Sequence, residues 1–281
     1  MFFFIIRRKM KKIFFGIFAM LFFFACDQEN AKHEVQKSDS LALVAEEDSM
    51  LPADLEVKHP EADGLFDDFI YLFMQNKSLQ FDRIQFPLKW TSNGDEHFIE
   101  KNAWVYDSIY LNQSETTLIV DGNQIGEDNP HAEMVKATVE WIDLNDQVIK
   151  QYRFSKIEQQ WILVEINEED FDALPDMDFY RFYSKFATDE EYQMKHIHNP
   201  FYFKTFDYDN DEELKGWVAA EQWPAYRVYI PADKITNILY DNIRAKCNYR
   251  TFIISSPSSG MNCNLIFKYV NHRWLLVRME N

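Results

Sequence analysis

The sequence contains nearly the same hydrophobic hexapeptide twice, and this repetition limits the folds that the chain can adopt. Residues 161–166 read WILVEI and residues 274–279 read WLLVRM. The two segments begin 113 residues apart, at 161 and 274, and each is rich in aliphatic residues after a tryptophan, as β-strands often are. A strand that recurs at a long, fixed separation predicts two copies of one structural unit in tandem.

The same separation relates other parts of the chain. At this shift residues 66–88 align with residues 179–201, and several of their phenylalanines coincide. Further matches within the units are Phe154 with Phe267, Trp161 with Trp274, and Trp104 with Trp217. Aromatic residues make up 16% of the chain, so one coincidence would mean little, but a series of matches indicates a duplication. We assign residues 61–168 to a first unit and residues 174–281 to a second.

Each unit opens with the pattern of an amphipathic helix. Apolar residues recur at the spacing i, i+3, i+4, i+7 and i+8, which places them on one helical face that packs against a core. In the first unit they are Phe66, Phe69, Ile70, Phe73 and Met74, and in the second Phe179, Phe182, Tyr183, Phe186 and Ala187. A second short helix is expected in each unit, with Thr188 and Glu191 as a capping box in the later one. Pro87 and Pro200 are expected to mark the ends of these short helices.

The last third of each unit predicts an antiparallel meander of three strands. In the first unit the segments are 137–143, 148–154 and 161–166, and in the second 249–254, 262–270 and 274–279. Helices followed by strands are typical of the α+β class. We therefore predict two tandem α+β repeats, each with N-terminal helices packed on a curved antiparallel sheet. The second unit is expected to fold alone or nearly so.

The first 25 residues have the features of a bacterial secretory signal. A basic start at residues 10–12 precedes an apolar run at residues 13–25. Because a transmembrane helix needs about 18 to 20 apolar residues, this run favours cleavage over membrane insertion. The sequence FFFAC resembles the lipobox of bacterial lipoproteins, with Ala25 before a lipid-modified Cys26 and Phe23 where leucine is usual. An ordinary signal with an incidental cysteine is the alternative.

An acidic segment, residues 26–60, follows the leader and predicts a flexible tether to the membrane. Removal of residues 1–25 takes away five cations and no anion, so the formal net charge changes from −17 to −22. Such a body repels phosphate backbones and anionic lipid surfaces. We therefore expect no nucleic-acid partner and attachment to the membrane through the lipid anchor alone. The expected location is the cell envelope, in the outer membrane with the body on its periplasmic or surface face.

Two helices on one face of a bent antiparallel sheet resemble the nuclear transport factor two-like superfamily, a cone-shaped fold shared with ketosteroid isomerases and polyketide-cyclase-like proteins. With the lipobox and the acidic tether, the paired units also resemble an uncharacterised family of gut-bacterial lipoproteins, which implies no activity. In the isomerase branch a tyrosine and one or two carboxylates line an apolar cavity. No such set is identifiable here, since Tyr71 and Tyr183 do not occupy matched positions of the repeat.

The sequence lacks the motifs of several common catalytic and binding sites. The chain has seven glycines and neither a glycine-rich phosphate loop nor a G-x-S-x-G motif. Residues 207–213 begin like a calcium loop, but Glu212 stands where the turn needs glycine and Val218 where the bidentate glutamate belongs. His196 and His198 have no further cluster to complete a metal site. We predict no metal, no cofactor and no catalytic residue.

The mature chain has two cysteines besides Cys26. In the hairpin predicted for the second unit, Cys247 lies opposite about residue 268 and Cys263 opposite about residue 252. This register keeps the two sulfur atoms apart. We therefore expect two buried free thiols, although an envelope protein has access to oxidising conditions.

Two kinds of function remain. The first is a non-catalytic lipoprotein that binds a small ligand, a glycan or another envelope protein through a pocket or groove. The second is an isomerase- or hydrolase-type enzyme with a pocket between the helices and the curved sheet. Missing catalytic motifs favour the first, because folds of this kind host many functions and do not imply catalysis.

Strand alternation suggests how the units pack. It places Ile162, Val164 and Ile166 under the helices of the first unit, so that Trp161 points the other way. In the second unit it places Leu275, Val277 and Met279 under the helices, with Trp274 on the opposite face. We therefore hypothesise an intramolecular pseudo-dimer with these two faces at the contact, in a protein that is a monomer. The candidates for a pocket or for this contact are Trp104, Trp161, Trp217 and Trp274.

Overall fold

Both amphipathic stripes form the expected helices. In the computed structural model, α1 (Phe66–Gln75) buries all five apolar residues of its stripe, and α3 (Asp178–Thr188) buries four of its five. The structure describes residues 63–122, 134–174, 177–241, 247–256 and 258–281. The leader, Cys26 and the whole of the tether therefore lie outside the described residues. None of the described helices is long and apolar enough to cross a membrane.

The short helices begin and end differently from the prediction. α2 (Lys77–Asp82) and α4 (Glu190–Lys195) start after Asn76 and Asp189, whose side chains accept backbone N–H groups of the first turn. The capping box predicted at Thr188 is wrong, because its hydroxyl donates to the carbonyl of Ser184 one turn earlier. The prolines do not end the helices either. Pro87 and Pro200 follow cis peptide bonds inside β1 (Ile84–Ser92) and β7 (Ile197–Asp207).

The strands form two mixed sheets, and the α+β prediction is confirmed. The first sheet has the order β2-β1-β6-β5-β4-β9 and the second the order β3-β10-β11-β12-β7-β8. The predicted meanders are present in both. A parallel pair in each sheet, β1 with β6 and β7 with β12, was not predicted and brings the first strand of each half beside its last. The bounds not yet given are β2 (Asp95–Ile99), β3 (Thr116–Asp121), β4 (Lys136–Asp143), β5 (Val148–Ile157), β6 (Gln160–Asp170), β8 (Glu212–Val218), β9 (Lys234–Tyr240), β10 (Tyr249–Ser256), β11 (Met261–Val270) and β12 (Arg273–Glu280).

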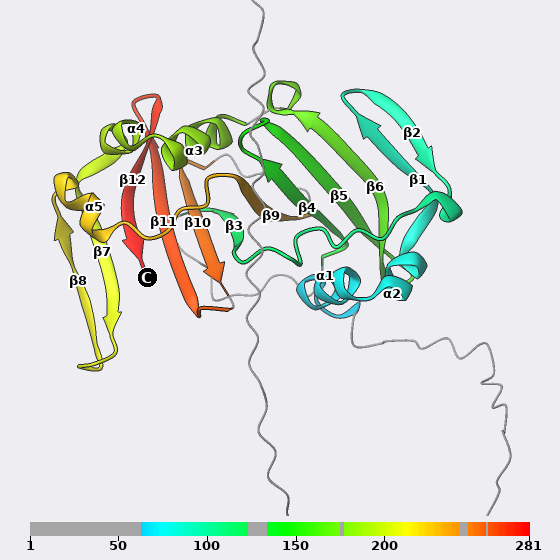
Figure 1. Cartoon of the computed structure of the whole chain (residues 1–281), viewed down its shortest axis with the longest axis horizontal. Coiled ribbons are helices and arrows are strands. Elements are labelled where there is room, and N and C mark those ends of the chain that lie inside the picture. The colour runs from blue at the N-terminus through cyan, green and yellow to red at the C-terminus, as the bar shows by residue number, and fades with distance from the viewer. Residues whose placement is uncertain (1–62, 123–133, 175–176, 242–246, 257) are drawn as a thin grey trace, which may run out of the picture. The chain divides into compact units, whose positions relative to one another are not determined.

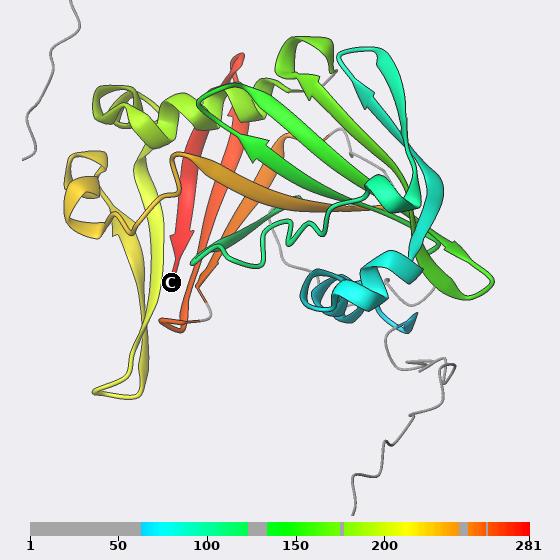
Figure 2. The same cartoon turned by 45° about the vertical axis from the view of Figure 1, so that its right-hand side comes forward.

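Two strands are exchanged between the halves. β3 comes from the first half of the sequence but pairs with β10 of the second sheet, whereas β9 comes from the second half and pairs with β4 of the first. Figures 1 and 2 show both strands between the two sheets. Thr117 of β3 and Thr236 of β9 meet there, and each backbone N–H donates to the hydroxyl of the other at 2.8 Å. Each hydroxyl in turn donates to the carbonyl of the other, at 2.7 and 2.8 Å. This reciprocal pair marks a local two-fold axis between the halves.

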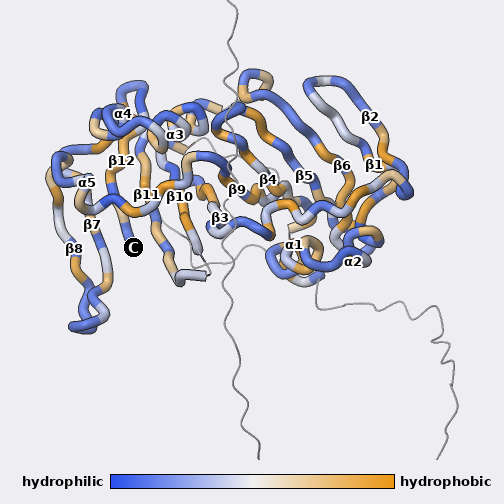
Figure 3. Tube along the Cα trace, viewed as in Figure 1, coloured by the Kyte–Doolittle hydropathy of each residue, from blue (hydrophilic) through white to orange (hydrophobic). Residues whose placement is uncertain are grey.

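A bulge in β6 changes which residues face the helices. Trp161, Leu163 and Ile166 lie in the core of the first half, and the rings of Trp161 and Phe66 are 4.9 Å apart. Alternation is interrupted because the register with β5 shifts and leaves Val164 without a partner on that strand. The predicted helix-facing set was therefore wrong for Ile162 and Val164 and right for Ile166, and Trp161 serves its own half. Figure 3 shows the alternation of hydrophobic and hydrophilic residues along the strands.

β12 repeats this bulge in the second half. Trp274, Leu276 and Met279 lie in its core, while Val277 has no partner on β11. The rings of Trp274 and Phe179 are 5.1 Å apart, and the indole N–H of Trp274 donates to the carboxyl of Asp178 at 3.1 Å. The hypothesis that Trp161 and Trp274 form the contact between the units is therefore wrong. β3 and β9 make that contact instead.

The separation of 113 residues does not hold in the middle of the units. Trp104 follows the 3-10 helix η2 (Lys101–Ala103) and donates its indole N–H to Gln80 at 3.1 Å. Trp223 follows η5 (Ala220–Gln222), begins α5 (Trp223–Tyr226) and donates in the same way to Gln193 at 3.0 Å. These two tryptophans are 119 residues apart, because the β7–β8 hairpin is longer than the β1–β2 hairpin. The predicted pairing of Trp104 with Trp217 is therefore wrong.

Candidate functional site

The outer face of the second sheet carries an aromatic groove. Core residues such as Phe201, Leu265 and Met279 point to the opposite face, toward the helices. The groove has a volume of about 410 Å³. We use the term aromatic groove for the cavity lined by His198, Tyr202, Trp217, Tyr249, Lys268, Val277 and Arg278.

Exposed rings and cations alternate across this groove. Trp217 is 68% exposed, and its ring lies 5.3 Å from that of Tyr202 in an edge-on arrangement. The guanidinium of Arg278 lies 5.2 Å from the centre of the Tyr202 ring. At the other side of the groove, the ammonium of Lys268 lies 5.2 Å from the ring of Tyr249. These contacts hold the cations in place by cation–π attraction while Trp217 remains open to a ligand.

The corresponding surface of the first sheet is closed by ion pairs. Lys89 occupies the position of Tyr202, since each lies on the strand beside the last strand of its half. The ammonium of Lys89 contacts Glu96 at 2.7 Å and Glu165 at 3.3 Å, and Arg153 contacts Glu165 at 2.8 Å. Hydrogen bonds to Glu96 and Glu165 raise the pKa of Lys89. These side chains satisfy one another, whereas the equivalent Tyr202 and Arg278 line the aromatic groove in the second half.

Pairwise comparison of the halves identifies the groove residues that sequence analysis missed. The charged partner of Lys89 on β6, Glu165, corresponds to Arg278 on β12. Trp217 corresponds to Phe98, which is 62% exposed and lies opposite Lys89. Trp217 was predicted through its mistaken match with Trp104, and Tyr202, Lys268 and Arg278 were not predicted. The sequence itself contained the clue, because the charged pair of Lys89 and Glu165 in the first half is replaced by Tyr202 and Arg278 in the second.

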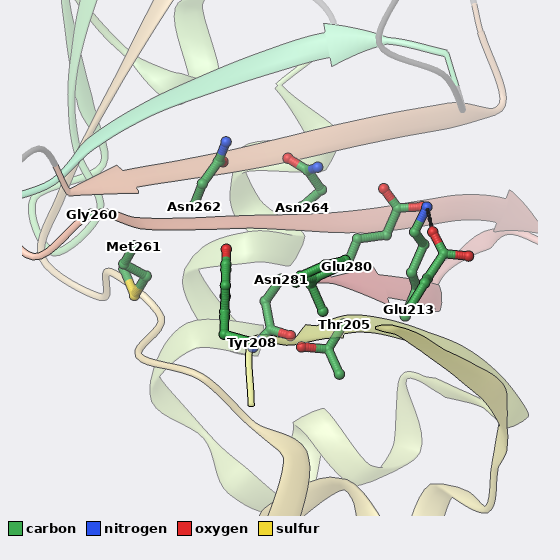
Figure 4. Close-up of a pocket in the computed structure, with 11 residues that line it drawn as sticks. Thr205, Tyr208, Glu213, Gly260, Met261, Asn262, Asn264, Glu280 and Asn281 are labelled. Atoms are coloured by element: carbon green, nitrogen blue, oxygen red, sulfur yellow. Dashed lines mark ion pairs between the residues drawn. The ribbon is translucent and has the colours of Figure 1, made fainter. Parts of the chain in front are cut away.

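A second cavity, which we call the amide hollow, lies next to the groove on the same face. Its volume is about 460 Å³, and its lining includes Lys204, Thr205, Tyr208, Asn262, Asn264 and Glu280. Figure 4 shows Tyr208 of the β7–β8 turn with its hydroxyl directed toward the strand that carries Asn262 and Asn264. Hydrogen bonds from Lys204 and Lys215 lower the pKa of Glu213, at the edge of the hollow, to about 2.

Two smaller cavities lie elsewhere on the protein. One of about 310 Å³ is lined by Trp274 together with residues of α3 and α4. The other, of about 290 Å³, lies at the junction of the halves and includes Asp67, Tyr110, Thr236 and Tyr240. The hydroxyl of Tyr240 donates to the carboxyl of Asp67. Because this carboxyl is already bonded to a tyrosine of the protein, it is poorly placed to act as a base on a substrate.

The four candidate tryptophans fall into different environments. Trp104 and Trp161 are buried in the first core. Trp274 is buried in the second core and contributes an edge to the 310 Å³ cavity. Trp217 is exposed and lines the aromatic groove. Of the four, Trp217 alone presents most of its ring to solvent.

Two other carboxyl–tyrosine pairs lie away from these cavities. The hydroxyl of Tyr152 donates to Asp107 at 2.6 Å, and that of Tyr180 donates to Glu140 at 3.0 Å. Neither pair lines any of the four cavities described above. Burial and the nearby Asp107 raise the pKa of Tyr152, so its hydroxyl keeps its proton as a structural donor. These contacts hold the fold together and leave no room for a substrate between the two groups.

The segments considered for metal binding form local contacts. Asp207 accepts N–H groups from Asp209 and Asn210 within its own turn, and His196 and His198 bond to backbone carbonyls of different residues. Among the described residues no three His, Cys, Asp or Glu side chains are grouped so as to hold a metal ion.

Cys247 and Cys263, the two cysteines among the described residues, are free, as expected. Cys263 is buried, which raises the pKa of its thiol to about 12, but Cys247 is only half-buried. The hairpin register also differs by two residues from the prediction, since Lys268 pairs with Tyr249 and Cys263 with Ile254.

Comparisons with known proteins agree with this architecture. The profile of a family described as "Domain of unknown function (DUF4348)" matches residues 47–281. The chain belongs to this family. It is also similar to the crystal structure of an NTF2-like protein from Bacteroides fragilis, at 30% identity and a TM-score of 0.67. That likeness covers 78% of this chain and 96% of the other. The expected nuclear transport factor two-like fold is therefore confirmed. No curated protein sequence matches the chain.

Proposed function

We propose that this protein is an envelope-anchored lipoprotein that acts as a non-catalytic binding module, with the aromatic groove as its binding site. The main support is the exposed ring of Trp217 above a groove lined by cations. A cavity of about 410 Å³ falls in the range of about 300–1,000 Å³ that is usual for small-molecule sites. The ligand therefore combines an apolar face with negative charge.

The chemistry of the lining supports binding without catalysis. The groove is lined by no Asp, Glu, Ser or Cys, so it offers neither a carboxylate pair nor an activated nucleophile. Its one histidine, His198, bonds through Nδ1 to the carbonyl of Pro200. Cations and rings that remain fixed are suited to recognise charge and shape.

The anchor is proposed from the sequence. Ala25 and Cys26 fit a lipobox, and residues 26–60 would connect the lipid to the folded body. Metabolic labelling with an alkyne fatty acid should tag the wild-type chain and leave Cys26→Ser unlabelled. Equal labelling of both chains would remove the anchor from the proposal.

The binding site is tested by comparing two exposed aromatic residues at equivalent positions. Full-length wild type, Trp217→Ala and Phe98→Ala are purified from envelopes in mild detergent, and their bound small molecules are identified by mass spectrometry. We expect a compound that is retained by wild type and Phe98→Ala but reduced about tenfold in Trp217→Ala, equivalent to about 1.4 kcal/mol. Equal retention by all three proteins would place the ligand elsewhere.

A further inference from the structure

The aromatic groove and the amide hollow lie on neighbouring parts of the same strands of the second sheet. We propose that this surface binds an acidic oligosaccharide, a chain of sugar rings with carboxylate or sulfate groups, which lies across both cavities. The inference rests on the proposed function, because it takes the aromatic groove as one end of the site. Four kinds of observation support it: the position of the cavities, their rings, their unpaired polar atoms and their charge.

The two cavities lie next to each other on the same strands. Tyr202 and Lys204 alternate with core residues on β7, as Asn264 and Lys268 do on β11, so they share the outer face. On β12, Arg278 pairs with Ile266, and Asn264 lies two positions farther along β11. Arg278 and Asn264 are thus diagonal neighbours, about 7–8 Å apart. A single elongated ligand therefore reaches both.

Each cavity presents an exposed aromatic ring. Trp217 is 68% exposed at the groove and Tyr208 is 87% exposed at the hollow. Sugar rings have an apolar face of C–H groups, which packs against an aromatic ring, and a rim of hydroxyls that need polar partners. Two rings separated by polar side chains match a chain of such units better than they match one continuous apolar ligand.

The polar atoms between the rings call for both a donor and an acceptor. Nε of Arg278 and Oδ1 of Asn264 are buried and have no hydrogen-bond partner among the described residues. An unpaired buried polar atom costs about 1–3 kcal/mol, and the side chains that carry these two atoms line the groove and the hollow. A sugar hydroxyl both donates and accepts, so one ligand serves the two atoms. Asn262 and Thr205 add further amide and hydroxyl groups.

The charge of the surface favours isolated anionic groups. Lys268 and Arg278 line the groove, while Glu280 and Glu213 line the hollow and are paired with Arg278 and Lys204. The chain as a whole carries −17, which disfavours a dense polyanion such as nucleic acid. A single uronate or sulfate group meets the local cations without that long-range penalty.

An extended peptide fits this surface less well. β7, β12 and β11 each have neighbours on both sides, so their backbone groups are engaged in the sheet. Recognition of an extended peptide by strand addition would use the free edge of β8, whereas the two cavities are lined by side chains on the face of the sheet. Side-chain recognition of a ligand without backbone pairing is therefore favoured.

The test uses the full-length chain on an array of neutral, uronic-acid and sulfated oligosaccharides, followed by calorimetric titration of the best ligand. We expect binding of an acidic oligosaccharide of two or more sugar units, with its neutral counterpart about tenfold weaker. The uronic-acid and sulfated arms identify the source of the charge. Trp217→Ala and Tyr208→Ala should each weaken binding about tenfold, Arg278→Gln should abolish the preference for acid, and Phe98→Ala should change nothing.

The outcomes separate this inference from the proposed function. A ligand of another class that is retained from envelopes only when Trp217 is present would support the groove but overturn the oligosaccharide. Absence of binding across the acidic arms of the array, or equal binding of neutral chains, would overturn it as well. An effect of Trp217→Ala without any effect of Tyr208→Ala on longer chains would contradict the two-cavity site. If Trp217→Ala alters no binding at all, both proposals fail.

Discussion

At the scale of single residues, Trp161 and Trp217 show how the same side chain serves stability in one place and recognition in another. Trp161 is 1% exposed and packs against Phe66. Its truncation to alanine should lower the free energy of unfolding by about 3–5 kcal/mol, because it leaves a cavity in the core. Trp217→Ala should change the free energy of unfolding by less than about 0.5 kcal/mol, since the Trp217 ring is mostly in solvent. Chemical denaturation of the full chain measures both, and similar losses would contradict this division of roles.

Asp107 gives the protein a pH-dependent contribution to stability. Burial opposes its ionisation, but the hydrogen bond from Tyr152 and the charge of Lys150, 3.3 Å away, outweigh burial and lower the pKa of Asp107. A carboxyl whose pKa is lower in the folded than in the unfolded state stabilises the fold above the unfolded value of about 3.9. This stabilisation is lost as the pH falls through the folded value.

We therefore expect Asp107→Asn to destabilise the protein at pH 7 and to have a smaller effect at pH 3. The free energy of unfolding in urea at the two pH values measures the difference. Asp146→Asn, at an exposed position in a turn, serves as the control and should change little at either pH. A destabilisation by Asp107→Asn that is equal at pH 7 and pH 3 would show that the carboxyl acts through its shape alone.

At the scale of helices and strands, the periodicity of the sequence predicted the elements whose formation depends on neighbouring residues. The stripe from Phe66 to Met74 identified α1 because helical periodicity requires no distant partner. The bulge at Val164 and the exchange of β3 and β9 were not predicted, since strand pairing is decided by residues far away in the sequence. The groove was missed for the same reason, because its rings and cations come from β7, β8, β10, β11 and β12.

α3 connects the two halves through a buried polar contact. The hydroxyl of Tyr180 donates to Glu140 of β4, and Asn237 of the exchanged β9 donates to the same carboxyl at 2.9 Å. Gln151 donates to the other oxygen of Glu140 at 2.9 Å. Tyr180→Phe should lower the free energy of unfolding by about 1–3 kcal/mol, because one buried partner of this carboxyl is lost.

A double-mutant cycle tests this contact. Glu140→Ala combined with Tyr180→Phe should cost less than the sum of the two single changes, since each removes the same hydrogen bond. Denaturation of the four full-length proteins gives the coupling energy. Strictly additive effects would mean that α3 is held to the first sheet by its apolar contacts alone.

At the scale of the whole molecule, the halves depend on each other. The second half of the sequence supplies β9 to the first sheet and receives β3 in return, so neither half contains a complete sheet. The expectation that residues 174–281 fold alone lacks support for this reason. With both exchanged positions filled inside one chain, we propose that the full protein is a monomer, which light scattering of the detergent-purified chain would measure.

The local two-fold axis predicts how the isolated second half behaves. In the absence of β3, the edge of β10 is unpaired, and β9 has no β4 to join. Thr117 and Thr236 occupy equivalent positions, so β9 of one copy can take the place of β3 on β10 of another. Residues 174–281 should therefore form a symmetric dimer in which Thr236 meets Thr236 of the second copy, an exchange that costs little because the element is the same.

Light scattering should give twice the mass of the fragment, and Thr236→Pro, which removes the paired N–H, should abolish the dimer while Thr236→Ser keeps it. A monomeric fragment with cooperative unfolding would show that the second sheet is complete without an exchanged strand.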